Sequence, residues 1–180
     1  MSEHENPMSI RSKNALSGAL LKLMMTTPFK DITISDITHR ARLSRQTFYT
    51  NFSKKEDILH YLVEGLFCRY SAQISELNTP PSSLLVEYFF YWDLHRDFLS
   101  LLFCHGLGEI FQEHNRKFFT SDDSLNSILN TEEILHPYIR ASLAGLTYEL
   151  LWLWLTDERG LSIDDLTILA KNLLAGNIFV

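Results

Sequence analysis

Apolar residues recur at intervals of three and four along almost the whole chain, and this period constrains its fold more than any other feature. Between residues 9 and 27, one side of a helix would collect Ile10, Leu16, Leu20, Leu23 and Met24. Proline and glycine, which interrupt helices, number only five and seven among 180 residues, and alternating β-branched runs are scarce. The sequence therefore predicts an all-α fold of about nine helices.

Short polar stretches divide the predicted helices. The run "NTPPSS", residues 78–83, ends a long helix predicted over 54–77. The polar run 120–133 is expected to be a loop. Gly160 and Ser162 are expected to end one helix and cap the next, which places the last two helices at about 134–156 and 162–176.

A basic N-terminal part precedes an acidic remainder. Residues 1–60 hold nine Lys and Arg against six Asp and Glu, whereas residues 61–180 hold seven against sixteen. The net charge of −6 for the whole chain hides this asymmetry. A polyanion is therefore the expected partner of the N-terminal part alone.

The cysteine content and the first residues bear on the compartment. Only two cysteines are present, Cys68 and Cys104, which argues against a disulfide framework and for a reducing environment. The start "MSEHENPMSI" lacks the basic and apolar regions of a secretory signal, and no apolar run is long enough to cross a bilayer. We expect a cytoplasmic protein with no membrane partner.

A helix-turn-helix pattern occupies residues 33–52. Thr33, with Asp36 three residues later, forms a capping-box pattern at the start of one short helix. After a break at Arg42 and Leu43, Ser44 is expected to cap a second short helix that continues to about residue 51. Two short helices separated by about three residues match the helix-turn-helix unit.

The second short helix is predicted to bury aromatic rings and to expose polar groups. Phe48 and Phe52 lie four residues apart, so they share a face that can pack on the preceding helices. The open side would carry groups suited to the base edges and phosphates of a DNA duplex, namely Arg45, Gln46, Thr47, Tyr49 and Thr50. A solvated helix end without a function is the alternative.

The stretch "ITISDITHRARLSRQTFYTNFSKKEDIL", residues 32–59, resembles the DNA-binding signature of the tetracycline-repressor (TetR) family of transcriptional regulators. The shared features are a threonine-capped helix, an alanine before the turn, a serine cap, the run T-F-Y-x-x-F and a lysine just beyond it. The resemblance implies an N-terminal three-helix DNA-binding domain and a larger helical C-terminal domain for regulation and dimerisation. It implies base contacts by Arg45, Gln46 and Thr47, and phosphate contacts by Thr33, Ser44, Tyr49, Asn51 and Lys55.

Three positions depart from the pattern of that family. Arg42 stands where glycine is usual, so it must accept left-handed geometry or reshape the turn, and it is a further candidate for a phosphate contact. Asn51 stands where histidine is frequent, and it still offers a donor. Lys54 takes the usual cap position of the next helix, so Ser53 is expected to cap instead; Lys54 is also a candidate phosphate contact.

The C-terminal part is expected to dimerise. We place the domain boundary after residue 53, so that residues 1–53 bind DNA, while residues 54–180 bind an effector and pair with a second copy. Residues 150–155 are apolar on every helical face and need cover on two sides, one of which an identical chain can supply. The predicted dimer contacts are Leu146, Leu150, Leu153, Trp154, Leu166, Leu169 and Leu173. A monomer with Trp152 and Trp154 in its own core is the alternative.

Aromatic residues and histidines concentrate between residues 87 and 119. An apolar cavity with a few polar groups is the usual form of a small-molecule site, and it would suit an apolar or aromatic effector. The predicted lining residues are Tyr88, Tyr91, Trp92, His95, Phe103, His105, Phe111 and Tyr148. Alternatively, these rings fill the core and the C-terminal part docks a partner protein. A cavity lined from residues 88–114 would favour the effector, and a packed interior beside an exposed apolar patch would favour the partner.

Other chemistry has little support in the sequence. His95, Cys104, His105 and His114 can bind metals but lack a zinc spacing, and the two cysteines are weak candidates for a redox switch. No catalytic triad, nucleophile elbow or phosphate-binding loop stands out, so we expect neither an enzyme nor a cofactor. The sequence predicts a homodimeric DNA-binding transcriptional regulator, an effector-released repressor of a near-palindromic operator in double-stranded DNA.

Overall fold

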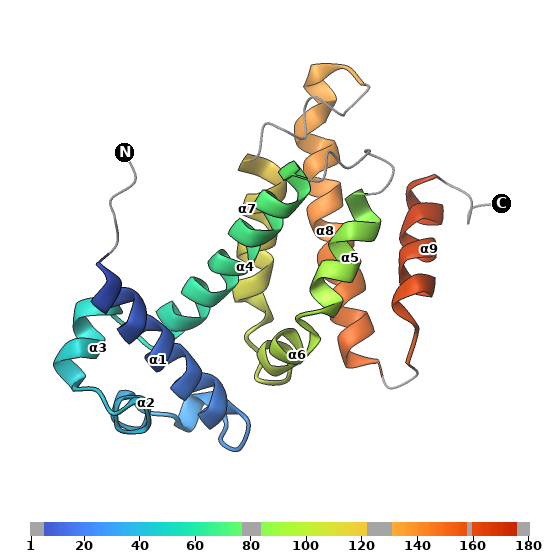
Figure 1. Ribbon diagram of the computed structural model, residues 1–180. Coiled ribbons are helices and arrows are strands. Elements are labelled where there is room, and N and C mark those ends of the chain that lie inside the picture. Colours follow the sequence, from blue (N-terminus) through green and yellow to red (C-terminus); the bar gives the residue numbers. More distant parts are fainter. Residues whose placement is uncertain (1–5, 77–83, 122–130, 158–159, 176–180) are drawn as a thin grey trace. The chain divides into compact units, whose positions relative to one another are not determined.

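The computed structural model describes residues 6–76, 84–121, 131–157 and 160–175 (Figure 1). Within these ranges the chain forms nine α-helices and two short 3-10 helices and no strand, which confirms the predicted all-α class. The predicted loop at 78–83 and residues 122–130 of the predicted loop at 120–133 lie outside the described residues. No helix among the described residues has the length and apolarity needed to traverse a bilayer.

The chain divides into two compact units, Met1–Gly65 and Leu66–Val180, which we call the N-terminal unit and the C-terminal unit. The division falls within α4 (Glu56–Glu76), so each unit contains part of that helix. The functional boundary after residue 53 stays a prediction.

The N-terminal unit contains three complete helices, a 3-10 turn and the first part of α4. In chain order the elements before α4 are α1 (Pro7–Met24), η1 (Phe29–Asp31), α2 (Ile34–Ala41) and α3 (Arg45–Asn51). The helix α1 packs on both α2 and α3 (Figure 1). Their shared core is apolar, and its buried side chains include Leu16, Leu20, Met24, Phe29, Ile37, Phe48 and Ile58.

The C-terminal unit is built from the rest of α4 and five further helices. These are α5 (Leu84–Asp93), α6 (Arg96–Cys104), α7 (Gly108–Ser121), α8 (His136–Thr156) and α9 (Ile163–Leu174), with η4 (Glu133–Leu135) before α8. The helix α8 packs on α6 and α7, and α9 packs on α5 and α8. Gly160, before α9, has a left-handed φ of 72°, which glycine adopts more readily than other residues. The Ser162 hydroxyl accepts a hydrogen bond from the Asp165 N–H, so Ser162 caps α9 as predicted.

Candidate functional site

Hydrogen bonds between residues three apart fix the start of α2. The Thr33 hydroxyl oxygen accepts the Asp36 backbone N–H at 3.2 Å, and the Thr33 backbone N–H donates to the Asp36 carboxylate at 2.9 Å. This is the predicted capping box. The hydrogen bonds from Thr33 also lower the pKa of Asp36, because they favour the ionised carboxylate.

The turn between α2 and α3 depends on Arg42. Its backbone is left-handed, with φ 55° and ψ 41°, and no other non-glycine residue in the described ranges has a positive φ. Arg42 N–H donates to the His39 carbonyl at 3.1 Å, and Leu43 N–H donates to the Thr38 carbonyl at 2.9 Å, so the turn is closed as a helix C-terminus usually is. Of the two geometries open to Arg42, the structure therefore shows the left-handed one.

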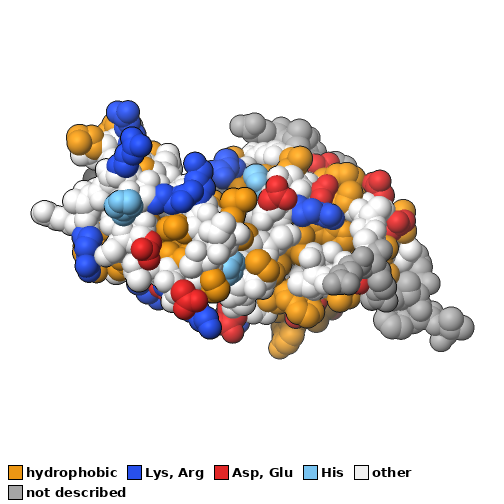
Figure 2. Space-filling view, turned by 90° about the horizontal axis from the view of Figure 1, so that it is seen from below, with side chains coloured by type: hydrophobic (Ala, Val, Ile, Leu, Met, Phe, Trp, Pro, Cys, Tyr) orange, Lys and Arg blue, Asp and Glu red, His pale blue; other side chains and the backbone are white. Residues whose placement is uncertain are grey.

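Phe48 of α3 and the following Phe52 are buried, and most polar side chains of α3 are exposed, as predicted. Phe48 is fully buried and Phe52 nearly so, and their ring centroids lie 6.0 Å apart. Ser44 caps α3 by accepting the Thr47 N–H at 3.0 Å. Arg45, Gln46 and Tyr49 are exposed, and Thr47 is half-buried. Figure 2 shows Lys and Arg side chains gathered over the N-terminal unit on one face of the molecule.

Two of the residues expected to contact phosphates are engaged within the N-terminal unit. The Asn51 side chain accepts a hydrogen bond from the Ser9 hydroxyl at 2.7 Å and donates one to the Thr47 carbonyl at 2.7 Å. The Lys55 ammonium donates to backbone carbonyls of the segment before α2. Arg42 and Lys54 are exposed, so their side chains are accessible to DNA.

The start of α4 is capped by Asp57, which was not among the predicted residues. The Asp57 carboxylate accepts the backbone N–H of Ser53 at 2.8 Å and that of Lys54 at 3.0 Å. An acidic residue in the first turn of a helix is the sequence signal that could have indicated this contact.

The aromatic residues predicted to line a cavity pack against one another instead. Tyr88, Trp92 and Phe111 are fully buried, and Tyr91 and Phe103 nearly so. Ring centroids lie 4.7 Å apart for Trp92 and Phe111, 4.9 Å for Tyr91 and His95, and 6.1 Å for Phe103 and Tyr148. His105 is half-buried at the end of α6. The structure thus assembles most of the predicted lining as a packed core.

A buried polar network crosses this aromatic core. The Tyr88 hydroxyl donates to the side-chain oxygen of Asn115 at 2.6 Å, and the Asn115 amide donates to the Ala144 carbonyl at 2.8 Å and to the Thr147 hydroxyl at 3.1 Å. Burial raises the pKa of the Tyr88 hydroxyl. Because α5, α7 and α8 each contribute one side chain, the network ties these three helices together. Sequence patterns gave no signal for Asn115 or Thr147.

Burial also affects His95, one of the two histidines of the predicted lining. It lowers the pKa of His95, and the charge of Arg69 acts in the same direction. Among the described residues, no group of three or more His, Cys, Asp or Glu side chains is arranged to hold a metal ion.

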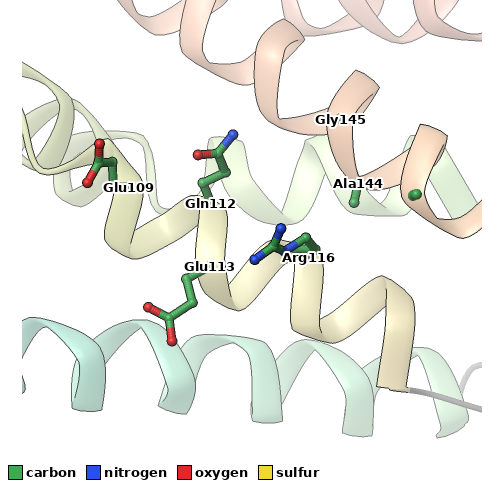
Figure 3. Close-up of a pocket in the computed structure, with 7 residues that line it drawn as sticks. Glu109, Gln112, Glu113, Arg116, Ala144 and Gly145 are labelled. Atoms are coloured by element: carbon green, nitrogen blue, oxygen red, sulfur yellow. The ribbon is translucent and has the colours of Figure 1, made fainter.

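A pocket of about 540 Å³ lies between α7 and α8, away from the predicted lining. In Figure 3 the charged and amide side chains project from α7, and the small residues belong to α8. The lining residues are Glu109, Gln112, Glu113, Arg116, Ala141, Ala144 and Gly145. Except for Ala144, all of them are exposed, so the pocket is an open groove whose charged side chains come from α7.

The last two helices leave apolar side chains exposed. Trp152 is 43% exposed, Leu153 50% and Ile168 55%, and Leu169 and Leu174 are also exposed. Of the predicted dimer contacts, Leu153 and Leu169 are therefore accessible, whereas Leu146, Leu150 and Leu173 are half-buried.

Trp154 and Leu166, also predicted at the dimer interface, lie inside the C-terminal unit. Both side chains are buried. The Trp154 indole donates to the Leu161 carbonyl at 2.8 Å, and the Arg96 guanidinium lies 3.8 Å from the centroid of its ring. Trp154 thus packs within the C-terminal unit, whereas Trp152 is exposed.

Comparisons with known proteins agree with this architecture. Residues 17–62 match the family model described as "Bacterial regulatory proteins, tetR family". The HTH-type dhaKLM operon transcriptional activator DhaS of Lactococcus lactis is 34% identical over 59 residues, which are 33% of this chain and 32% of that protein. The matched part thus spans about a third of this curated relative.

Solved structures share the fold over nearly the whole chain. Lin0861 from Listeria innocua has a TM-score of 0.81 at 13% identity and covers 98% of this chain and 96% of its own. Thermus thermophilus FadR, a transcriptional repressor in complex with lauroyl-CoA, has a TM-score of 0.55 at 17% identity, with 93% and 95% covered. At sequence identities of 13% and 17%, this structural similarity establishes the fold.

Proposed function

This chain belongs to the tetR family of bacterial regulatory proteins, and from that membership we propose that it is a homodimeric DNA-binding transcriptional regulator of a near-palindromic operator. The observation that carries the proposal is α3, in which buried Phe48 and Phe52 fix the helix while Arg45, Gln46 and Tyr49 remain exposed. A short helix anchored on one side and polar on the other is suited to the major groove of DNA.

The polar side chains of the helix-turn-helix and of the start of α4 have separate roles on the duplex. Arg45, Gln46 and Thr47 read base edges, because Arg and Gln form paired hydrogen bonds with guanine and adenine, and Thr can contact the thymine methyl group. Thr33, Arg42, Ser44, Tyr49 and Lys54 contact phosphates, which sets the position of the protein on DNA without reading sequence.

Dimerisation uses the exposed apolar side chains of α8 and α9. Trp152, Leu153, Ile168 and Leu169 would be covered by the same residues of a second copy, in an isologous two-fold contact. The two copies of α3, the recognition helices, then read two half-sites that lie one helical turn of DNA apart, or a multiple of it. Each half-site contributes only part of the affinity.

Regulation by a small apolar or aromatic effector is the first candidate for control. The lauroyl-CoA bound to the repressor FadR supports it for a protein of this fold. In this candidate, the effector releases the repressor by favouring a conformation that binds DNA poorly.

Docking of a partner protein on the C-terminal unit is the second candidate, and the packing of the interior favours it. The rings of Tyr88, Trp92 and Phe111, which were predicted to line the effector cavity, contact one another in the core. The described pocket is instead an open, charged groove between α7 and α8, where a segment of another protein can lie. The relative DhaS is named an activator, so recruitment is a natural outcome of such docking.

The test of the DNA-binding proposal is a footprint of the purified protein on the DNA that flanks its own gene. We expect protection of two half-sites at one strong site, and loss of that protection in the Arg45→Ala/Gln46→Ala double variant at equal folded concentration. Wild-type protein that protects no specific sequence would overturn the proposal. Adding cell extract or small-molecule extract to the binding reaction then separates the two candidates for control.

A further inference from the structure

Three backbone carbonyls converge on one lysine ammonium in the N-terminal unit. The Lys55 Nζ atom lies 2.6 Å from the Phe29 oxygen, 2.8 Å from the Ile32 oxygen and 3.3 Å from the Lys30 oxygen. It also lies 4.4 Å from the centroid of the Phe29 ring. An ammonium group carries three N–H donors, and here all three have acceptors. The charge is further stabilised by the face of the aromatic ring.

These contacts join the two ends of the helix-turn-helix. The carbonyls belong to η1 and to Ile32, immediately before the Thr33 cap of α2, whereas Lys55 follows α3 and immediately precedes α4. The bond from Lys55 to Ile32 therefore spans 23 residues and encloses both short helices. These hydrogen bonds fix the position of the chain before α2 relative to its position after α3. Lys55 thus restrains the position of α2 and of α3, the recognition helix.

A phosphate contact would compete with this arrangement. Turning the ammonium toward DNA would take this donor away from three carbonyl oxygens, and the bonds to the Phe29 and Ile32 oxygens are part-buried. The neighbouring Lys54 is exposed, and its side chain makes no hydrogen bond or ion pair with any described residue. A lysine that contacts phosphate is thus available one position earlier.

We propose that Lys55 is a positioning residue, which holds the helix-turn-helix in its DNA-binding geometry through the carbonyls of residues 29, 30 and 32, and that Lys54 supplies the phosphate contact at the start of α4. This inference rests on the proposed DNA-binding function. It assigns the two adjacent lysines opposite roles, one inside the N-terminal unit and one toward DNA.

The experiment compares Lys55→Met, Lys55→Arg and the matched control Lys54→Ala in the full-length protein. Two quantities are measured for each variant, the melting temperature without DNA and the operator affinity at several salt concentrations, well below every melting temperature. We expect Lys55→Met to lower the melting temperature by roughly 5 °C or more and to weaken binding by about tenfold, with the salt dependence unchanged. A merely structural lysine would leave the affinity of the folded variant unaltered.

Lys55→Arg separates charge from geometry. It keeps the positive charge, so a phosphate contact would survive in this variant. However, the planar guanidinium cannot direct three donors to converging carbonyls, so we expect it to lose stability and affinity in the way Lys55→Met does. This variant also keeps the test decisive if Lys55→Met is too unstable for the binding assay.

Lys54→Ala is expected to behave in the opposite way. Its melting temperature should match the wild type, and the slope of log affinity against log salt should fall by about 0.9 for each subunit on DNA. The inference is overturned if Lys55→Met shows this loss of slope at an unchanged melting temperature, or if Lys55→Arg keeps both the melting temperature and the operator affinity of the wild type. Wild-type protein that binds no operator overturns the proposed function itself, and that failure is visible before any variant is compared.

Discussion

The Ser9 hydroxyl donates a hydrogen bond to the side-chain oxygen of Asn51 at 2.7 Å, which ties the first turns of α1 to the last residue of α3. Since the Asn51 amide also donates to the Thr47 carbonyl, both polar atoms of this side chain are engaged. Asn51 therefore holds the C-terminal end of the recognition helix, whereas the family pattern implies a phosphate contact at this position.

The Ser9–Asn51 contact can be measured with a double-mutant cycle. Ser9→Ala should lower the free energy of unfolding by about 1 kcal/mol, and Asn51→Ala by more, because it also removes the bond to Thr47. The double variant should be no less stable than Asn51→Ala alone, since the two residues share one interaction. Urea denaturation of the four proteins gives these values. Fully additive losses would show that the two side chains do not interact.

Arg42→Gly should make the protein more stable and weaken its binding to DNA. A left-handed backbone costs about 1 kcal/mol for a residue with a Cβ atom, and glycine avoids that cost. The same change removes a positive charge that we place near phosphate. The measurements are urea denaturation and operator affinity against salt.

Arg42→Ala is the control for this prediction. It removes the charge but keeps the strained backbone, so it should bind DNA as weakly as Arg42→Gly without any gain in stability. A gain in stability for Arg42→Ala, or none for Arg42→Gly, would argue against backbone strain at this turn.

Tyr88→Phe should destabilise the C-terminal unit although it removes only one oxygen atom. The Asn115 side-chain oxygen would lose the donor that now lies 2.6 Å away, and it is fully buried. Leaving such an acceptor unsatisfied costs about 1–3 kcal/mol. Tyr49→Phe, on an exposed tyrosine, is the matched control and should change stability by less than about 0.5 kcal/mol in the same urea titration.

Hydrogen bonds between near neighbours were predictable from the sequence. The caps at Thr33, Ser44 and Ser162 each join residues three apart, so the residue types at two positions are sufficient to indicate them. The left-handed Arg42 was also among the predicted alternatives, because the turn leaves few geometries open. These features depend on the chain within one or two helical turns.

Contacts between distant segments were not predictable in this way. The carbonyl partners of Lys55 and the Ser9 partner of Asn51 lie 23 to 42 residues away, and these contacts depend on how the helices of the N-terminal unit pack. A run that is apolar on every helical face, such as residues 150–155, also does not indicate which of its side chains face the core. The sequence pattern led us to place Trp154 at the dimer interface, and only the packing of α8 shows that Trp154 is buried while Trp152 is exposed.

Charges placed on the exposed apolar face of α8 and α9 should separate the proposed dimer. Trp152→Glu and Ile168→Glu would each bury a carboxylate at a two-fold contact, which is unfavourable without a paired cation. We expect a monomer by light scattering at micromolar concentration, and loss of binding to the full operator. Leu94→Glu, at a side chain that is 80% exposed outside α8 and α9, should remain a dimer. Dimers in all three variants would place the interface elsewhere.

Gln46 and Tyr49 lie on the exposed side of the same short helix, and their substitution should have different effects on operator preference. Gln46→Ala removes a side chain that can pair with adenine, so it should reduce discrimination by about 1–3 kcal/mol at one base pair of each half-site. Tyr49→Phe removes a hydroxyl that we assign to a phosphate, so it should weaken binding to every sequence alike. Affinities for a panel of single-base operator variants measure both effects. If Gln46→Ala weakens all of them equally, Gln46 does not read a base, and Arg45 and Thr47 remain as the residues of α3 that can.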